Sequence, residues 1–108
     1  MRLATTVEEI RTRQGAVVSR MASPVRAGEE KYVARRLAEL DVPIALTVGG
    51  RGTLEGADCQ WLAPDTVLCG VGVRTNREGY EQVRALLDRQ GIRCLSAPVP
   101  PHVQHLLG

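Results

Sequence analysis

The sequence predicts a mixed α/β (α+β) fold in which one unit, a strand, a loop, a helix and a strand, is used twice. Short β-branched runs alternate with two helical patterns that carry apolar residues on one face. The second half of the chain repeats the first at a shift of 50 positions. Apolar residues then align at Val17 and Val67, Val33 and Val83, Leu37 and Leu87, and Val42 and Ile92. Internal repetition of this period is typical of blades around an axis or of stacked modules.

The first half is divided into an N-terminal extension, residues 1–14, and the first copy of the unit, about 15–48. Thr6-Val7-Glu8-Glu9 fits a capping box, which predicts a short helix over residues 6–13. Within the copy, AVVSRM is a predicted strand, and ASPVRAG, with its Pro and Gly, is a predicted loop. An amphipathic helix and the strand PIALTV follow, so that the four elements cover residues 16–21, 22–28, 29–40 and 43–48.

The second half begins with residues 49–63, which are expected to join the copies. The second copy, about 65–99, is predicted to contain a strand, a loop, a helix and a strand at 66–72, 74–79, 80–89 and 92–99. Residues 100–108 form a tail that carries two histidines. Because two such units leave outer strand edges unpaired, we expect a homo-oligomer or a complementing polypeptide.

The composition limits the classes of function. With 108 residues, of which 44% are hydrophobic and 24% charged, the chain forms one domain with enough apolar side chains for a core. A net charge of +2, dispersed arginines and few aromatic rings argue against a nucleic-acid partner. No apolar run reaches the roughly 18 residues of a membrane span, and the polar N-terminus is unlike a signal peptide. Three widely spaced cysteines without C-x-x-C spacing favour a reduced, cytoplasmic protein, and we expect no cofactor and no metal.

The stretch TLEGADCQWL, residues 53–62, places two acids, Glu55 and Asp58, directly before Cys59. One interpretation is a polar loop that leads into a strand, and the other is a pocket for a small cation. Strict strand alternation would send residues three positions apart to opposite faces. Gly56 allows the backbone to bend, so that both acids can turn towards one pocket.

Two arginines occupy comparable places in the copies. Arg26 and Arg74 each follow the first strand of a copy, so pseudo-symmetry would bring both to the same end of the fold. Two guanidinium groups at one mouth suit an anionic group such as a carboxylate. The simpler interpretation is a pair of surface arginines.

The chain contains four motifs, PVRAGEE, GTLEGAD, GVGVRTNREG and HLLG, at residues 24–30, 52–58, 70–79 and 105–108. In this order and spacing they resemble the guanidine-modifying superfamily, and together they cover most of residues 15–108. That superfamily includes amidinotransferases, arginine deiminases and dimethylarginine dimethylaminohydrolases. The resemblance implies the pentein fold, a five-bladed α/β propeller. This chain would form its central portion, two ββαβ-type repeats of an incomplete propeller.

The resemblance also implies roles for individual residues. Glu55 and Asp58 would bind the guanidinium of a substrate, because carboxylates satisfy that planar cation through charge-assisted hydrogen bonds. His105 would be the general acid/base, and neighbouring carboxylates would favour its protonated form. Arg74, and with it Arg26, would hold the carboxylate of the substrate. The implied chemistry is covalent: a Cys thiolate attacks the guanidinium carbon, an amine leaves, and water or another amine resolves the intermediate.

The chain departs from the superfamily pattern at the nucleophile, because the reactive cysteine of the family follows the catalytic histidine in a much longer chain. Cys59, Cys69 and Cys94 do not occupy that place, and each is predicted as a core residue of a strand. His102 and His105 have H-x-x-H spacing, but without further ligands they do not predict a metal site.

Two functional hypotheses follow. The first is a catalytically incomplete amidinotransferase-like or deiminase-like domain that binds an arginine-like guanidino compound, with the cysteine supplied by another polypeptide. The second is a non-catalytic oligomeric or guanidine-binding module. The sequence does not separate a guanidino-group hydrolase from a transferase, because water and an amine acceptor use the same core residues.

Overall fold

The computed structural model describes residues 9–12, 14–20 and 29–100, which form an α+β architecture with two three-stranded sheets. The first sheet contains β1 (Glu9–Thr12), β2 (Gly15–Val18) and β3 (Ile44–Thr47), and α1 (Glu29–Glu39) lies between β2 and β3 in the chain. The second contains β4 (Cys59–Ala63), β5 (Thr66–Val71) and β6 (Arg93–Pro98), and α2 (Arg77–Arg89) lies between β5 and β6. A short 3-10 helix, η1 (Gly56–Asp58), precedes β4.

The two sheets have the same connectivity. The first two strands of each sheet are antiparallel, and the third strand is parallel to the second. Because a parallel pair needs a crossover connection, a helix joins the second and third strands in both cases. Each sheet with its helix is therefore a ββαβ unit.

The turns that follow the two helices also match. The amide of Val42 donates to the Leu37 carbonyl at 2.9 Å, and the amide of Ile92 donates to the Leu87 carbonyl at 2.9 Å. In both turns the residue before the donating amide has a positive φ, 56° in the first and 75° in the second. These residues align at the shift of 50 that relates the two halves of the sequence, so the backbone repeats there as well.

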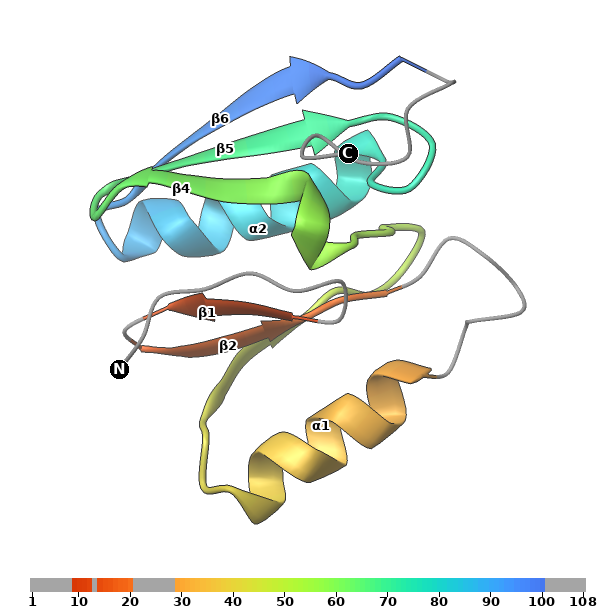
Figure 1. Ribbon diagram of the computed structural model, residues 1–108, viewed down its shortest axis with the longest axis vertical. Helices are drawn as coiled ribbons and strands as arrows, with labels where there is room; N and C mark the ends of the chain where they lie inside the picture. The colour runs from red at the N-terminus through yellow and green to blue at the C-terminus, as the bar shows by residue number, and fades with distance from the viewer. Residues whose placement is uncertain (1–8, 13, 21–28, 101–108) are drawn as a thin grey trace.

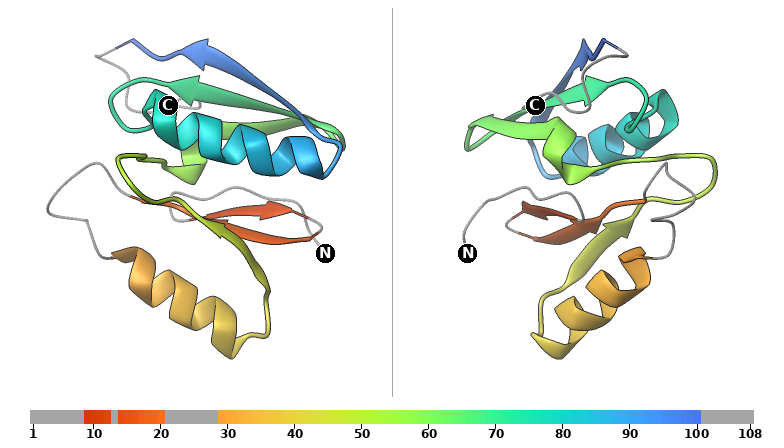
Figure 2. Two further views of the ribbon diagram at one scale, coloured as in Figure 1. Left: turned by 180° about the vertical axis from the view of Figure 1, so that it is seen from behind. Right: turned by 45° about the vertical axis from the view of Figure 1, so that its right-hand side comes forward.

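Helix α2 lies between the two sheets, as Figures 1 and 2 show. Its buried residues Val83 and Leu87 share the main core cluster with Ile10 and Val17 of the first sheet and Val67 of the second. The chain has no Phe, so aliphatic side chains make up most of this core, together with Cys59, Cys69 and the buried ring of Tyr80, and the partly buried Trp61 packs against it.

The first sheet is covered on both faces. Val17 packs in the main cluster, whereas Ala16 and Val18 pack with Leu37 of α1 in a second cluster. Alternate residues of a strand point to opposite faces. The continuous apolar run of β2 is therefore buried throughout, in contrast to a strand with one wet face.

The helix predicted over residues 6–13 is wrong for residues 9–12, which form β1. Ile10 pairs with Val17 and is fully buried, and Thr12 donates from Oγ1 to the Gly15 carbonyl at 2.6 Å. A capping box contributes little by itself, and burial of Ile10 against α2 outweighs it. Residues 1–8, which include the start of the box, lie outside the described residues.

The second helix begins earlier than predicted. It starts at Arg77 instead of residue 80, because Asn76 is its N-cap and accepts a hydrogen bond from the Gly79 amide at 2.8 Å. The joining segment 49–63 contributes η1 and β4. In the part of the chain that the structure describes, no helix has the length and apolar character to cross a membrane.

Candidate functional site

The two acids of the EGAD motif lie on one short turn. The Asp58 amide donates to the Glu55 carbonyl at 2.9 Å and closes η1. Glu55 is the N-cap of η1, with extended backbone angles (φ −116°, ψ 127°), and Asp58 is its last residue, so the turn interrupts the alternation that a continuous strand would impose on the two side chains. The bend needs no positive φ at Gly56. Both acids are buried, Glu55 at 0% and Asp58 at 2% exposure.

Thr75 joins the two acids. Its Oγ1 accepts from the Glu55 amide at 3.1 Å and donates to Asp58 Oδ2 at 2.5 Å. Thr75 is itself fully buried in the segment between β5 and α2. Thr75 lies within the motif GVGVRTNREG, but the motif alone predicts no role for a threonine at this place. The structure makes it the residue that positions Asp58.

Arg74 contacts the acids directly. Its Nη1 lies 3.3 Å from Glu55 Oε2, and the two side chains are 27% and 0% exposed. A carboxylate as deeply buried as that of Glu55 is stable only when it is paired and hydrogen-bonded. Arg74 therefore compensates the charge of Glu55 in this structure.

The amide of Asn76 fixes the start of α2 against the segment that leads to the acids. Its Oδ1 accepts from the Thr53 amide at 2.9 Å, and its Nδ2 donates to the Arg51 carbonyl at 2.8 Å. A Cβ at Gly79 would collide with the Thr53 carbonyl oxygen, so only glycine allows this close approach. The motif R-T-N-x-x-G thus holds the EGAD turn from one side.

The first unit holds the same segment from the other side. The Arg20 amide donates to the Leu54 carbonyl at 3.1 Å, and the Leu54 amide donates to the Arg20 carbonyl at 2.8 Å. Arg20 also donates from Nη1 to the Gly50 carbonyl at 2.5 Å. Since Leu54 precedes Glu55, the acid pair lies where the two units meet.

The three cysteines, far apart in the sequence, come together in the second sheet. Cys59 Sγ lies 2.8 Å from Cys69 Sγ, and Cys69 Sγ lies 3.6 Å from Cys94 Sγ. The hydrogen bond with Cys59 and burial raise the pKa of Cys69, and the hydrogen bond with Cys69 and burial raise the pKa of Cys94. Both therefore keep their protons at neutral pH. The sequence signal for this cluster is the hairpin that places residues 59 and 69 opposite each other.

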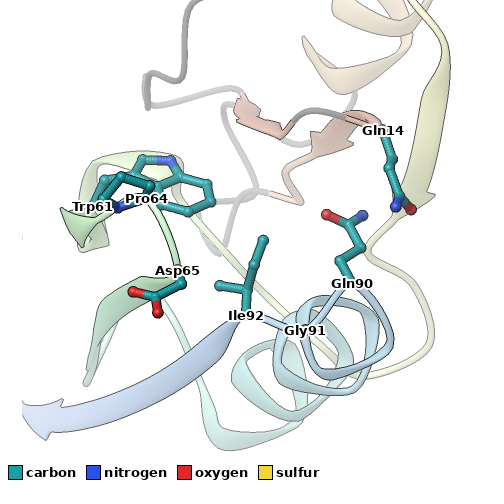
Figure 3. A pocket seen from close by; sticks show the side chains of 7 residues that line it. All are labelled: Gln14, Trp61, Pro64, Asp65, Gln90, Gly91 and Ile92. Atoms are coloured by element: carbon teal, nitrogen blue, oxygen red, sulfur yellow. The ribbon is translucent and has the colours of Figure 1, made fainter.

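A cavity of about 340 Å³ lies beside the β4–β5 turn (Figure 3). It is lined by Gln14 before β2, by Trp61, Pro64 and Asp65 near the β4–β5 turn, and by Gln90, Gly91 and Ile92 after α2. Among the described residues, Trp61 Nε1 and Gln90 Nε2 are buried without a hydrogen-bond partner. Of the predicted site residues that the structure describes, Glu55, Asp58 and Arg74, none lines this cavity, so it is separate from the acid pair.

Of the predicted site residues, the structure brings Glu55, Asp58 and Arg74 together. Arg26 and His105 lie outside the described residues, as does His102. Fold and site together define the class of protein: an α+β chain of two ββαβ units that buries two carboxylates where the units meet.

Comparison with known proteins gives the family. No family model matches the chain. An N(G),N(G)-dimethylarginine dimethylaminohydrolase of Streptomyces coelicolor is 33% identical over 87 residues, which are 81% of this chain and 33% of that protein. An uncharacterised protein of Aeropyrum pernix is 34% identical over 91 residues, 84% of this chain and 33% of that protein. The chain thus spans about a third of the length of these curated relatives.

Solved structures share the fold. Dimethylarginine dimethylaminohydrolase from Pseudomonas aeruginosa, complexed with citrulline, matches with a TM-score of 0.81 and 24% identity over 94% of this chain and 39% of that one. The N-terminal domain of ArgZ, a cyanobacterial arginine dihydrolase, matches with a TM-score of 0.77 and 18% identity, over 88% of this chain and 34% of that one. SxtG, an amidinotransferase from Microseira wollei, matches with a TM-score of 0.69 and 14% identity, over 96% of this chain and 37% of that one. The chain belongs to the guanidine-modifying superfamily, which confirms the resemblance of its motifs.

Proposed function

We propose that this chain forms the guanidinium-binding part of an enzyme that modifies the guanidino group of an arginine-like compound. The main observation in favour is the pair of buried carboxylates, Glu55 and Asp58, at the two ends of a single short turn. The relatives support the proposal, since they are named as a dimethylarginine dimethylaminohydrolase, an arginine dihydrolase and an amidinotransferase. Hydrolysis and amidino transfer are both compatible with it.

The electrostatics of the site suit a guanidinium. Glu55 already accepts from a guanidinium group, that of Arg74 at 3.3 Å. The Asp58 carboxylate is oriented by the Thr75 hydroxyl, so its position is defined before a ligand arrives. In the proposal, the substrate guanidinium replaces that of Arg74 at Glu55 and also binds Asp58. Arg74 is then available, together with Arg26, to hold the carboxylate of the substrate.

The proposed reaction is covalent. A Cys thiolate adds to the guanidinium carbon, the C–N bond to the departing amine breaks, and His105 protonates that amine. Attack by water or by an acceptor amine then releases the ureido or amidino product and restores the thiolate. We propose that this thiolate comes from polypeptide outside the 108 residues. Cys59 and Cys69 are buried against each other in the sheet, and a raised pKa keeps Cys69 protonated, which suits neither to the role.

The binding proposal is tested by calorimetry with arginine and with citrulline, whose neutral ureido group has the shape of a guanidinium. Arginine is expected to bind more tightly than citrulline. Asp58→Asn is expected to weaken arginine binding by about tenfold or more, because a charge-assisted hydrogen bond is lost. Asp88→Asn, which changes an exposed acid on α2, is the matched control. Equal arginine affinities of the two variants would contradict the proposed site.

Turnover by the chain alone tests the origin of the nucleophile. We expect no citrulline from arginine with this chain, and citrulline when polypeptide that contains the missing cysteine is added. Robust turnover by the chain alone that stops with Cys59→Ser would overturn the assignment. That outcome would leave guanidinium binding by Asp58 intact, so the two proposals are separable.

A second candidate function is a non-catalytic oligomeric or guanidine-binding module. It is favoured by apolar side chains on outer strands, Ile44 on β3, Leu62 on β4 and Leu95 on β6, which are 40–54% exposed. In this proposal the two ββαβ units are blades of an α/β propeller, completed in the cytoplasm by further copies or by another polypeptide. Light scattering separates the candidates: a monomer that binds arginine contradicts a structural oligomer, and a tight oligomer without arginine affinity contradicts the enzyme.

A further inference from the structure

Two of the cysteines face each other across the β4–β5 hairpin. Cys59 and Cys69 are directly paired residues of the antiparallel strands, and their Sγ atoms are 2.8 Å apart. Directly opposite residues in such a pair have Cα atoms about 4.5–5.5 Å apart, within the range of disulfides. The backbone of the hairpin is therefore already arranged for a bond between these two residues.

The two sulfur atoms are closer than a relaxed contact allows. Non-bonded heavy atoms settle at about 3.5–4.0 Å, and 2.8 Å lies well inside that distance. Both residues are fully buried among apolar side chains of the main core cluster, beside α2. The antiparallel pairing of β4 and β5 therefore holds the two thiols side by side within the core.

The third cysteine is placed differently. Cys94 of β6 is paired with Val67, and Cys69 is paired with Ser96, so Cys69 and Cys94 are diagonal neighbours. Diagonal residues in a sheet lie about 7–8 Å apart, beyond the usual Cα range of a disulfide. Cys94 is therefore a natural control: its thiol lies near that of Cys69, but the two residues are not directly paired across the strands.

We propose that Cys59 and Cys69 form a reversible intramolecular disulfide, a modification site that ties the turn carrying Asp58 to β5. With hydrogen peroxide as oxidant, one thiol takes an oxygen atom and becomes a sulfenic acid, and one water is released. The sulfur of the second residue then attacks the sulfenyl sulfur, so that the S–S bond forms and the S–O bond breaks. The leaving hydroxide takes the remaining thiol proton as a second water. Two thiols have lost two electrons and two protons, and peroxide has been reduced.

The position of the bond links it to the acid site. Cys59 directly follows Asp58, and the Asp58 carboxylate is held by Thr75, which follows β5. A bond between residues 59 and 69 would anchor the end of η1 to the strand that leads to Thr75. The oxidised chain is expected to resist unfolding better than the reduced chain, because the cross-link restricts the unfolded state. Since Cys69 keeps its proton near neutral pH, oxidation is expected to be slow.

The test is intact-mass measurement and thiol counting on the native chain before and after treatment with hydrogen peroxide. The expected product has lost two hydrogen atoms, retains one free thiol of the three, and returns to the starting mass with a phosphine reductant. Proteolysis without reduction should yield a Cys59–Cys69 peptide pair. Three free thiols after treatment, or a bond from Cys69 to Cys94, would overturn the proposal.

Variants distinguish the paired thiols from the neighbouring one. Cys94→Ser is expected to form the same disulfide at a similar rate, whereas Cys59→Ser and Cys69→Ser should form no intramolecular bond. If a core variant does not fold, peptide mapping of the chain without substitutions, after oxidation, still identifies which two cysteines are bonded. Loss of disulfide formation with Cys94→Ser alone would contradict the direct pairing of residues 59 and 69.

Discussion

Replacement of Thr75 by Val tests how the acid site is held together. The two side chains have nearly the same shape, so packing is conserved while the hydroxyl is lost. The Glu55 amide then loses its acceptor at 3.1 Å, and Asp58 Oδ2 loses its donor at 2.5 Å, both in a fully buried environment. An unpaired buried donor costs about 1–3 kcal/mol and a hydrogen bond to a charged group contributes about 1.5–3 kcal/mol. We expect Thr75→Val to lower the free energy of unfolding by about 3–5 kcal/mol.

The assay is equilibrium unfolding in urea, because guanidinium chloride would supply the cation that the site is proposed to bind. Thr66→Val is the matched control, since Thr66 Oγ1 donates only to the exposed Asp65 at 3.1 Å. Its effect should stay within about 0.5 kcal/mol. If Thr75→Val were no more destabilising than Thr66→Val, the hydroxyl would not be bridging the two acids and the reasoning would fail.

Two further predictions concern the backbone beside the site and the thiols behind it. Gly79→Ala is expected to destabilise the fold by about 2–4 kcal/mol, because the added Cβ collides with the Thr53 carbonyl, whereas Gly49→Ala meets only one atom at 3.9 Å and should change stability little. Similar urea midpoints for the two alanine variants would refute this. Stability under reducing conditions is expected to fall as the pH rises above 9.0, the ordinary pKa of a thiol. The folded state raises the pKa of both Cys69 and Cys94, so each thiol ionises first in the unfolded chain, and stability present below pH 9.0 is lost by up to about 1.4 kcal/mol per pH unit for each thiol. Cys69→Ser should flatten this slope, and an unchanged slope would show that Cys69 does not cause it.

The elements of the fold were largely predictable from local patterns. The β-branched run around Val17 forms β2, the apolar spacing around Leu37 forms α1, and their counterparts at Val67 and Leu87 form β5 and α2. The exception is β1, where a capping box predicted a helix. Ile10 is buried there because a strand lies beside it in space, which a window of a few residues does not contain.

The candidate site was predictable in its residues but only partly in its geometry. The motifs identified Glu55, Asp58 and Arg74, and the structure brings all three together. Strand alternation made Gly56 the expected cause of the bend, whereas the structure has a 3-10 turn between the acids, closed by the hydrogen bond from the Asp58 amide to the Glu55 carbonyl. At the start of this turn the Glu55 amide donates to Thr75 Oγ1, a contact over 20 positions that local sequence patterns do not contain.

The sequence by itself determined the strands and helices of the two units, the repeat that relates them, and the acids that give the site its chemistry. These properties arise from preferences that act over a few residues, such as apolar periodicity, glycine turns and side-chain charge. Only the tertiary structure decided that Thr75 binds Asp58, that Arg74 lies against Glu55, and that two distant thiols meet in the core. These contacts join residues 10 to 19 positions apart, and they exist because the β4–β5 hairpin pairs residues 59 and 69 and because the segment between β5 and α2 lies against the turn that carries the acids.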